Sequence, residues 1–482
     1  MKHITSALLL IAMLASLAAC GGTESTPSAD STSAEPAETL SDFEKQIPKQ
    51  DFGGAEFRIV GRADGDLQSL HVYEMTAETE NGDVINDTVY ARNMKISEYL
   101  NVKIVCKPSA RNDVTALVQN AVMAGDDAYD LVWNHMQSVL SLVKSNLTAD
   151  LHSFDALSLD KPWWNQTVVE NFTINGKLPF AFCDIPFTSM LYIHCMFVNK
   201  TLAEEYLTED IYATVNAGKW TLDKLLAVTS DTRRDVNGDS KFDGNDAYGF
   251  MASYGEMGIF STSGAAEVLD IAADGSMTLK VMSERMQNIV DKSYKLAYDN
   301  NSSYIVSNSL EKDIAQMFAE GKSLFYSGFL SDPLLHFRDM KDDFALIPFP
   351  KYDEAQANYR TCISGGNGLL VIPKTVQNAE LVGAVTEALA YESYQTLRPA
   401  VLETVMVGKL LRDEESVEMF NTIIDGITID FDWLYHSGST GFGRILKDLI
   451  QKKSTDLASY VASIENAALA HYQTYIDNYM KD

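Results

Sequence analysis

The sequence predicts an α/β protein in which short apolar strands alternate with amphipathic helices. Apolar residues recur at helical spacing in residues 84–100 and 112–124, and each of these segments is followed by a residue that commonly ends helices. Short runs rich in β-branched and aromatic residues lie around them, at 56–61, 102–106 and 130–133. This order of strand, helix, strand, helix and strand predicts a parallel sheet covered by helices on both faces.

The alternation of strands and helices continues along the chain. Further strands are predicted at 190–198, 323–326, 344–347 and 368–372, and further helices at 220–230 and 310–319. From residue 379 onward the chain is predicted to be mostly helical, with breaks near Gly408, Gly426 and residues 438–443.

Residues 1–19 carry the features of a removable secretory signal peptide. Lys2 is followed by an apolar stretch, residues 4–19, that is too short to span a bilayer as a permanent helix. Residues 17–20 (LAAC) resemble a bacterial lipobox, which implies that Cys20 is diacylated and becomes the mature N-terminus. The alternative is an ordinary signal peptide with a chance cysteine.

Residues 20–50 are predicted to form a disordered tether. Residues 21–39 contain no aromatic residue and no lysine or arginine, and alanine is their only aliphatic side chain. Such a segment cannot bury enough surface to offset its ordering entropy. Its random-coil reach is about 30 Å. We therefore expect the protein on the outer face of the cytoplasmic membrane, held through the lipid anchor only, with a folded body beginning near Asp51.

The folded body holds about 430 residues, enough for two domains of ordinary size. The chain is 46% hydrophobic and 22% charged, as in globular proteins, and its formal net charge is −29. This charge argues against nucleic-acid binding, which needs a basic surface, and against direct adhesion to anionic lipid. We expect a monomer.

Four cysteines lie within the predicted body: Cys106, Cys183, Cys195 and Cys362. None of them forms a C-x-x-C pair, so neither a zinc ribbon nor a thioredoxin-like redox site is indicated. Small buried hydrophobic residues are the default interpretation. An extracellular setting would also permit disulfides, and the sequence does not choose among the three possible pairings.

The sharpest chemical motif is a loop with oxygen side chains at positions 1, 3, 5, 9 and 12, the spacing of an EF-hand calcium site. These positions are Asp235, Asn237, Asp239, Asp243 and Asp246. Lys241 would add its backbone carbonyl. Ser240 stands where glycine is usual, and Asp246 replaces the usual glutamate. A strand is expected to follow the loop, so a bound Ca²⁺ would be structural and not a switch. The alternative is a solvated acidic turn without an ion.

Several local patterns occur in an order that resembles the type II extracellular solute-binding proteins of ABC importers, in particular the oligosaccharide-binding branch. The patterns are AYDLVW at 128–133, FVNK at 197–200, GKWT at 218–221, FAEGK at 318–322 and GGNG at 365–368. The resemblance covers nearly all of residues 51–482. It implies a two-lobed, periplasmic-binding-protein-like α/β fold of type II with a helical C-terminal region.

The resemblance also implies a division of the chain and a role. Residues 51–185 and 365–410 would form the first lobe, and residues 186–364 and 411–482 the second lobe, which includes the calcium loop. Such a receptor would capture a carbohydrate, expected to be an oligosaccharide, by lobe closure and deliver it to an ABC transporter permease. Open α/β sheets bind ligands at the carboxyl ends of their strands, in the cleft.

Sugars present apolar C–H faces and hydroxyl rims, so their receptors need flat aromatic side chains with polar groups at the edges. We predict ligand contacts from residues at strand ends and in loops: Trp133, Trp164, Asp184, Tyr326, Phe329 and Trp433. Burial in the core is the alternative for Trp133 and the favoured interpretation for Trp220. Arg62 and Glu74 could face the cleft, but a solvated position is favoured for both.

Two other classes of function remain open. One is a receptor for a peptide or another solute on the same fold, and the other is an extracellular glycan-acting enzyme, which needs only two carboxylates. The sequence contains no G-x-S-x-G, H-E-x-x-H, Walker or dinucleotide-binding motif. We therefore expect no catalytic activity.

Overall fold

The structure is a computed structural model that describes residues 40–64, 67–71, 74–405, 414–436 and 440–481. The chain divides into two compact units, Met1–Lys45 and Gln46–Asp482. In the first unit, the described residues include the beginning of helix α1 (Asp42–Gln46). The predicted signal peptide, Cys20 and most of the predicted tether lie outside the described residues, as does the predicted break at Gly408.

The second unit contains all the remaining helices of the described chain. In its first half they are α2 (Gln68–His71), α3 (Val84–Leu100), α4 (Arg111–Ala124), α5 (Met136–Lys144), α6 (Gln166–Phe172), α7 (Lys200–Tyr206), α8 (Ile211–Asn216) and α9 (Leu222–Thr229). In its second half they are α10 (Tyr254–Ser263), α11 (Glu284–Tyr294), α12 (Glu311–Ala319), α13 (Asp332–Leu335), α14 (Ala379–Glu392), α15 (Arg398–Val405), α16 (Glu414–Asp425), α17 (Phe431–Leu434), α18 (Ile445–Gln451) and α19 (Leu457–Tyr479).

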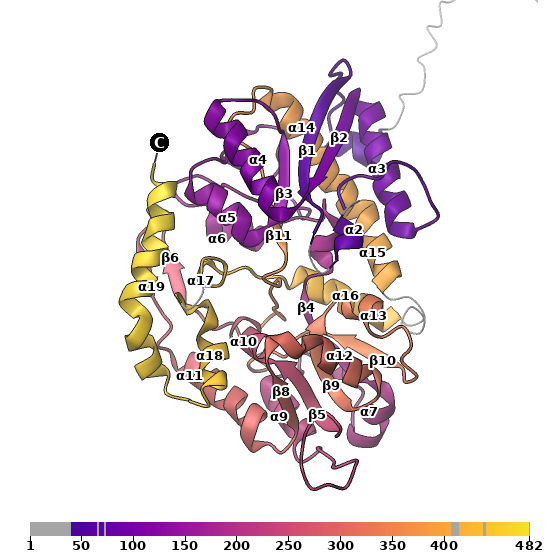
Figure 1. The fold of residues 1–482 in the computed structure, drawn as a ribbon, viewed down its shortest axis with the longest axis vertical. Coiled ribbons are helices and arrows are strands. Elements are labelled where there is room, and N and C mark those ends of the chain that lie inside the picture. The colour runs from indigo at the N-terminus through magenta and orange to yellow at the C-terminus, as the bar shows by residue number, and fades with distance from the viewer. Residues whose placement is uncertain (1–39, 65–66, 72–73, 406–413, 437–439, 482) are drawn as a thin grey trace, which may run out of the picture. The chain divides into compact units, whose positions relative to one another are not determined.

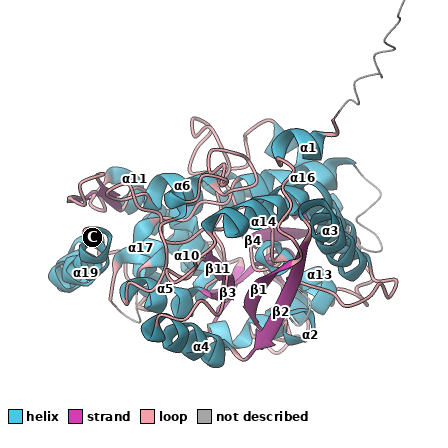
Figure 2. Ribbon diagram, turned by 90° about the horizontal axis from the view of Figure 1, so that it is seen from above, coloured by secondary structure: helices cyan, strands magenta, loops and turns pink. Residues whose placement is uncertain are grey.

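The first sheet of this unit has the strand order β11–β3–β1–β2. Strands β1 (Ala55–Arg62), β2 (Val102–Ser109) and β3 (Leu131–His135) run parallel, whereas β11 (Gly368–Val371) pairs antiparallel with β3. Helices α3 and α14 pack on one face and α4 and α5 on the other (Figure 2). The prediction of parallel strands with helices on both faces is therefore confirmed for β1, β2 and β3.

The second sheet has the order β10–β4–β9–β5–β8 and lies in the lower part of Figure 1, below the first sheet. Its strands are β4 (His194–Asn199), β5 (Tyr248–Ser253), β8 (Ser303–Val306), β9 (Ser323–Phe329) and β10 (Phe344–Ile347). Strand β5 pairs parallel with β8 and β9, while β4 pairs antiparallel with β9 and β10. A separate hairpin consists of β6 (Leu269–Ile271) and β7 (Met277–Leu279).

The chain passes between the two sheets along two adjacent segments, one before β4 and one before β11. The backbone N–H of Ser364 donates to the carbonyl of Tyr192 at 2.7 Å, and Ile193 pairs with Ile363 in an antiparallel bridge. We call the paired residues 191–193 and 363–367 the crossing. Two lobes joined by paired segments of this kind can move relative to each other by small backbone rotations.

Local signals predicted several element boundaries correctly. Helix α3 ends at Leu100 because Asn101 adopts the left-handed conformation, with φ of 48°, and α4 ends before Gly125, with φ of 72°. The predicted strand at 190–198 is wrong in its first part, since Phe187–Met190 form a 3₁₀ turn and β4 begins only at His194.

The region after β11 is helical, as predicted, wherever it is described. Helix α14 packs against α3, α16 against β10, and α18 against α10 and α11, while α19 contacts both α18 and α5. The boundaries of the two predicted lobes remain a prediction, and the contact between α19 and α5 joins residues assigned to different lobes. In the described ranges no helix is long and apolar enough to cross a membrane.

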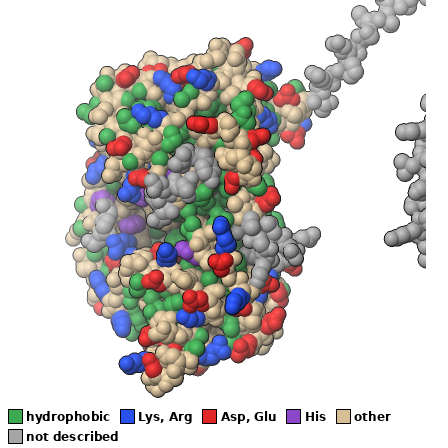
Figure 3. All heavy atoms as spheres, turned by 45° about the vertical axis from the view of Figure 1, so that its right-hand side comes forward, with side chains coloured by type: hydrophobic (Ala, Val, Ile, Leu, Met, Phe, Trp, Pro, Cys, Tyr) green, Lys and Arg blue, Asp and Glu red, His purple; other side chains and the backbone are tan. Residues whose placement is uncertain are grey.

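Charged side chains of both signs lie on the surface (Figure 3), and three of the four cysteines of the described chain are buried, as the default interpretation expected. Acidic and basic side chains are interspersed over the face drawn in Figure 3. The four cysteines of the described chain are free thiols, three of them buried: Cys183, Cys195 and Cys362. Burial raises the thiol pKa of Cys106 to about 12, so this group is a poor nucleophile at neutral pH.

Candidate functional site

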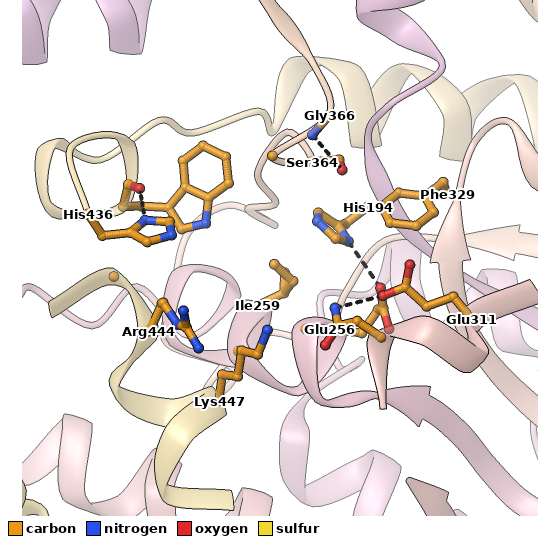
Figure 4. Close-up of a pocket in the computed structure, with 16 residues that line it drawn as sticks. His194, Glu256, Ile259, Glu311, Phe329, Ser364, Gly366, His436, Arg444 and Lys447 are labelled. Carbon is orange, nitrogen blue, oxygen red and sulfur yellow. Dashed lines mark hydrogen bonds and ion pairs between the residues drawn. The ribbon is translucent and has the colours of Figure 1, made fainter. Parts of the chain in front are cut away.

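A pocket of about 310 Å³ lies beside the crossing, between the second sheet and the C-terminal helices (Figure 4). Four parts of the chain supply its walls: strand ends of the second sheet, the beginnings of α10 and α12, the crossing, and the α17–α18 region. Its lining includes His194, Gly255, Glu256, Gly258, Ile259, Asn308, Glu311, Phe329, Ser364, Gly365, Gly366, Trp433, His436, Gly443, Arg444 and Lys447. We call it the crossing pocket.

One wall of the crossing pocket carries two carboxyl groups. Ser253 and Glu256 form a capping box at the start of α10, and the Glu256 carboxylate accepts the backbone N–H of Ser253 at 2.8 Å. The Glu311 carboxylate accepts the Ser253 hydroxyl at 2.9 Å and the Asn308 amide at 2.7 Å. The capping box thus holds the two carboxyl groups on the same side of the pocket.

Burial determines the protonation of this wall. Burial and the nearby Glu311 carboxylate raise the pKa of Glu256 to about 8, while burial alone lowers the pKa of His194 to about 3. The Nδ1 atom of His194 lies 3.9 Å from Oε1 of Glu256. At neutral pH this wall therefore offers a neutral imidazole and a carboxyl group that retains its proton in a large fraction of molecules.

The facing wall is cationic. Arg444 and Lys447 extend from the start of α18 toward the pocket, across from Glu256 and Glu311, with Ile259 between them (Figure 4). Arg444 forms an ion pair of 3.2 Å with Asp448. Burial and then the Arg444 guanidinium lower the pKa of Lys447.

Two predicted ligand residues, Phe329 and Trp433, line the pocket. Both are partly exposed, so each has ring surface available to a ligand. The Phe329 ring centroid lies 4.7 Å from that of His194. Trp433 accepts a backbone hydrogen bond from Nδ1 of His436, which holds the imidazole beside the indole.

The other four predicted ligand residues do not contribute to the pocket lining, and each is buried in the core. Tyr326 is 2% exposed; its ring packs among Phe197 and Phe318, and its hydroxyl donates to Asp332 at 2.8 Å. Asp184 is 5% exposed and accepts from Nε of Arg398 at 2.9 Å. In this structure these groups are structural and do not face a ligand.

The two predicted tryptophans of the first lobe are also core residues in this structure. Trp133 is completely buried in β3, and its indole leaves no room for a side chain at Gly368 of the neighbouring β11. Trp164 is 1% exposed, and its Nε1 donates to Glu387 at 3.0 Å, as does Nε1 of Trp163. Trp220 is buried as predicted and donates to the carbonyl of Pro348.

Arg62 and Glu74 are buried, 2% and 1% exposed, so the solvated position favoured from the sequence is wrong. Nη1 of Arg62 donates to the carbonyl of Gly366 at 2.7 Å, which ties the end of β1 to the crossing. Glu74 lies 3.8 Å from Nε of Arg62 and 3.7 Å from Nε2 of His71. Burial raises the pKa of Glu74 to about 7, so this carboxyl titrates near neutrality.

Sequence reasoning missed most of the polar residues of the crossing pocket. His194, Glu256, Glu311, Arg444 and Lys447 carry no motif that points to a ligand. One signal was present, the S-x-x-E capping box at residues 253–256, which predicts a helix start at the edge of the sheet. The GGNG segment at 365–368, one of the patterns that carry the family resemblance, lies at the end of the crossing and the start of β11.

In the predicted calcium loop, aspartate side chains accept hydrogen bonds from backbone N–H groups of the same loop. The Asp235 carboxylate accepts the N–H groups of Gly238 and Ser240, at 2.6 and 2.8 Å. Asp246 accepts those of Val236 and Asp243, each at 3.0 Å. Ser240 has a φ of 63°, the left-handed conformation that glycine usually supplies. No group of three or more His, Cys, Asp or Glu side chains arranged to hold a metal ion is found within the described part of the chain.

Residues 95–388, more than half of the 482-residue chain, match the family model for bacterial extracellular solute-binding proteins. The chain belongs to this family. A search of curated proteins found no match.

Solved structures share the fold at low sequence identity. The sugar-binding protein MalE from Xanthomonas citri has a TM-score of 0.56 at 13% identity, covering 88% of this chain and 98% of that one. A cyclo/maltodextrin-binding protein complexed with maltotetraose has a TM-score of 0.54 at 13% identity, covering 88% and 97%. A cyclic α-maltosyl-1,6-maltose binding protein from Arthrobacter globiformis has a TM-score of 0.50 at 14% sequence identity, covering 89% of this chain and 99% of that one. The predicted two-lobed, periplasmic-binding-protein-like fold is confirmed.

Proposed function

We propose that this solute-binding protein captures a carbohydrate, an oligosaccharide, in the crossing pocket and delivers it to an ABC transporter permease. The observation that carries the proposal is the combination of side chains in this pocket. Trp433 and Phe329 offer aromatic surface for the C–H faces of a sugar, and Glu311, Ser364 and His194 lie beside them for its hydroxyl rim. The fold neighbours named above for sugars and maltodextrins support this class of solute.

Capture would proceed by closure of the two lobes. The pocket borders the crossing, so a solute held there contacts residues whose positions depend on the angle between the lobes. A solute that makes more contacts in the closed form shifts the equilibrium toward that form. The hydrogen bond from Arg62 to Gly366 joins the first sheet to the crossing, so its length would be expected to change when the lobes move.

The experiment is a thermal-shift and calorimetric screen of the purified folded body against a panel of oligosaccharides and peptides. The expected result is a melting temperature that rises with the concentration of one class of glycan, as binding to the native state requires. X-ray scattering with that glycan should show a smaller radius of gyration. A rise with peptides and with no glycan would overturn the carbohydrate assignment.

Two further parts of the proposal concern residues outside the crossing pocket. We infer diacylation at Cys20, which would hold the receptor close to its permease on the outer face of the cytoplasmic membrane. We also infer that loop 235–246 binds a structural Ca²⁺, because its side chains supply the oxygen ligands that this hard cation prefers.

A further inference from the structure

The crossing pocket contains a charge arrangement that a neutral sugar does not require. Lys447 lines the pocket with its ammonium group directed into it, and among the described residues it has no carboxylate within ion-pair distance (Figure 4). The adjacent cation, Arg444, is paired with Asp448, whose other oxygen accepts the hydroxyl of Tyr460 at 2.6 Å. Asp448 therefore favours the charged form of Lys447 only from beyond ion-pair distance, because its two oxygens already bind Arg444 and Tyr460.

The packing of α18 fixes Lys447 in this position. Ile445, Leu446, Leu449 and Ile450 bury the other side of this helix. At the contact with α10, a Cβ placed on Gly258 would lie 3.4 Å from Cβ of Lys447, so the glycine leaves room for the base of the lysine. The base of the lysine is thus held beside the pocket.

A partly buried ammonium without a carboxylate in ion-pair contact is costly, and a second cation beside it increases the cost. Burial and then Arg444 lower the pKa of Lys447, and the more distant Asp448, Glu311 and Glu256 only partly offset this shift. An anionic group on the solute would remove that cost, and the guanidinium of Arg444 could share the same anion. The opposite wall suits the hydroxyl groups of the same solute, because the Glu311 carboxylate accepts from them and a protonated Glu256 carboxyl can donate or accept.

We propose that the solute is an acidic oligosaccharide containing a uronic acid, whose carboxylate binds between Lys447 and Arg444 while its ring contacts Trp433. This inference rests on the proposed carbohydrate function and specifies the solute class. Trp433 lies directly beside Gly443, the residue before Arg444, where a Cβ would come within 2.6 Å of Cα of Trp433. The backbone of Trp433 therefore adjoins the start of the segment that carries both cations, and all three side chains line the same pocket.

The test uses oligouronides of several linkages, each paired with its carboxyl-reduced neutral counterpart, so that ring and linkage stay constant. At low salt, at least one oligouronide should bind roughly 10- to 100-fold more tightly than its neutral counterpart, the effect of charge-assisted hydrogen bonds. Added salt should reduce this preference. Lys447→Met should abolish the preference, so that each oligouronide and its neutral counterpart bind this variant with equal affinity. Lys452→Met, an exposed lysine just after the same helix, should retain it.

The outcomes separate this inference from the proposed function. Equal or tighter binding of the neutral counterparts, or a preference that persists in Lys447→Met, overturns the acidic-sugar inference and leaves the carbohydrate receptor standing. The absence of binding by either member of every pair, with binding of a peptide, overturns both. A sulfated glycan that binds while every oligouronide fails overturns the uronic acid assignment.

Discussion

Replacing Glu387 should distinguish a structural role for Trp164 from a role in ligand binding. Glu387 lies in α14, is 4% exposed, and accepts both indole N–H groups of Trp163 and Trp164 at 3.0 Å. Glu387→Gln keeps the shape of the side chain but replaces one acceptor oxygen with an NH₂ group. That NH₂ group then faces an indole N–H, so one buried donor loses its partner.

The expected loss of stability follows from these two bonds. A hydrogen bond to a charged group contributes about 1.5–3 kcal/mol, so Glu387→Gln should lower the free energy of unfolding by about that amount. Glu387→Ala removes both bonds, which sets an upper limit of about 3–6 kcal/mol. The loss should fall in the lower half of that range, because burial raises the pKa of Glu387 and its removal relieves a desolvation cost.

The assay is urea unfolding followed by tryptophan fluorescence, combined with calorimetry for the glycan that the screen identifies. Glu380→Gln, an exposed position in the first turn of the same helix, is the matched control and should change stability by less than about 0.5 kcal/mol. Both Glu387 variants should bind the glycan with unchanged affinity. An unchanged urea midpoint together with a tenfold loss of affinity would refute the structural role and return Trp164 to the binding site.

The remaining predictions concern binding, pH, metal and anchoring. Trp433→Ala should weaken glycan binding by on the order of 1–3 kcal/mol, by analogy with bases stacked on aromatic side chains, with little change in melting temperature. The pKa of Glu74 in the folded protein, about 7, exceeds its ordinary value of 4.5. The stabilising contribution of this carboxyl group is therefore complete below pH 4.5 and is lost as the pH rises through 7. Glu74→Gln should flatten this part of the curve of unfolding free energy against pH, as measured by urea unfolding. Chelation should lower the melting temperature, and Asp235→Ala should abolish that response; a wild-type melting curve indifferent to chelator and added Ca²⁺ counts against the site. Cys20→Ala should move the protein from the membrane fraction to the soluble fraction, and continued membrane fractionation would contradict lipid anchoring.

Features that are determined by neighbouring residues in the sequence were predicted correctly, whereas features that depend on residues far apart in the sequence were not. Helices α3 and α4 end at Asn101 and Gly125, where a single residue adopts the left-handed conformation, and both ends were predicted. The antiparallel pairing of β11 with β3 places Gly368 opposite His135, a residue far from it in the sequence. No local signal encodes that pairing, and alternating strands and helices suggested parallel strands throughout.

The ligand residues illustrate a second limit. Tyr326 and Phe329 belong to the same strand and lie three residues apart, so their side chains point to opposite faces, but the alternation does not say which face is the core. In the structure Tyr326 points into the aromatic core with Phe197, whereas Phe329, at the strand end, reaches the pocket. Strand register and the curvature of the sheet decide this difference, and both depend on neighbours distant in sequence.

The crossing pocket combines side chains that no single segment could reveal as a site. His194, Glu256, Ser364 and Lys447 come from four distant parts of the chain, and the fold alone brings them to one cavity. The overall charge of −29 would suggest a receptor that repels anions. Interactions between exposed charges decay over about 10 Å at ordinary salt, however, so a solute inside the pocket responds mainly to the charges that line it. The charges of the side chains near Lys447, and not the net charge of the chain, should therefore determine whether an anionic sugar binds.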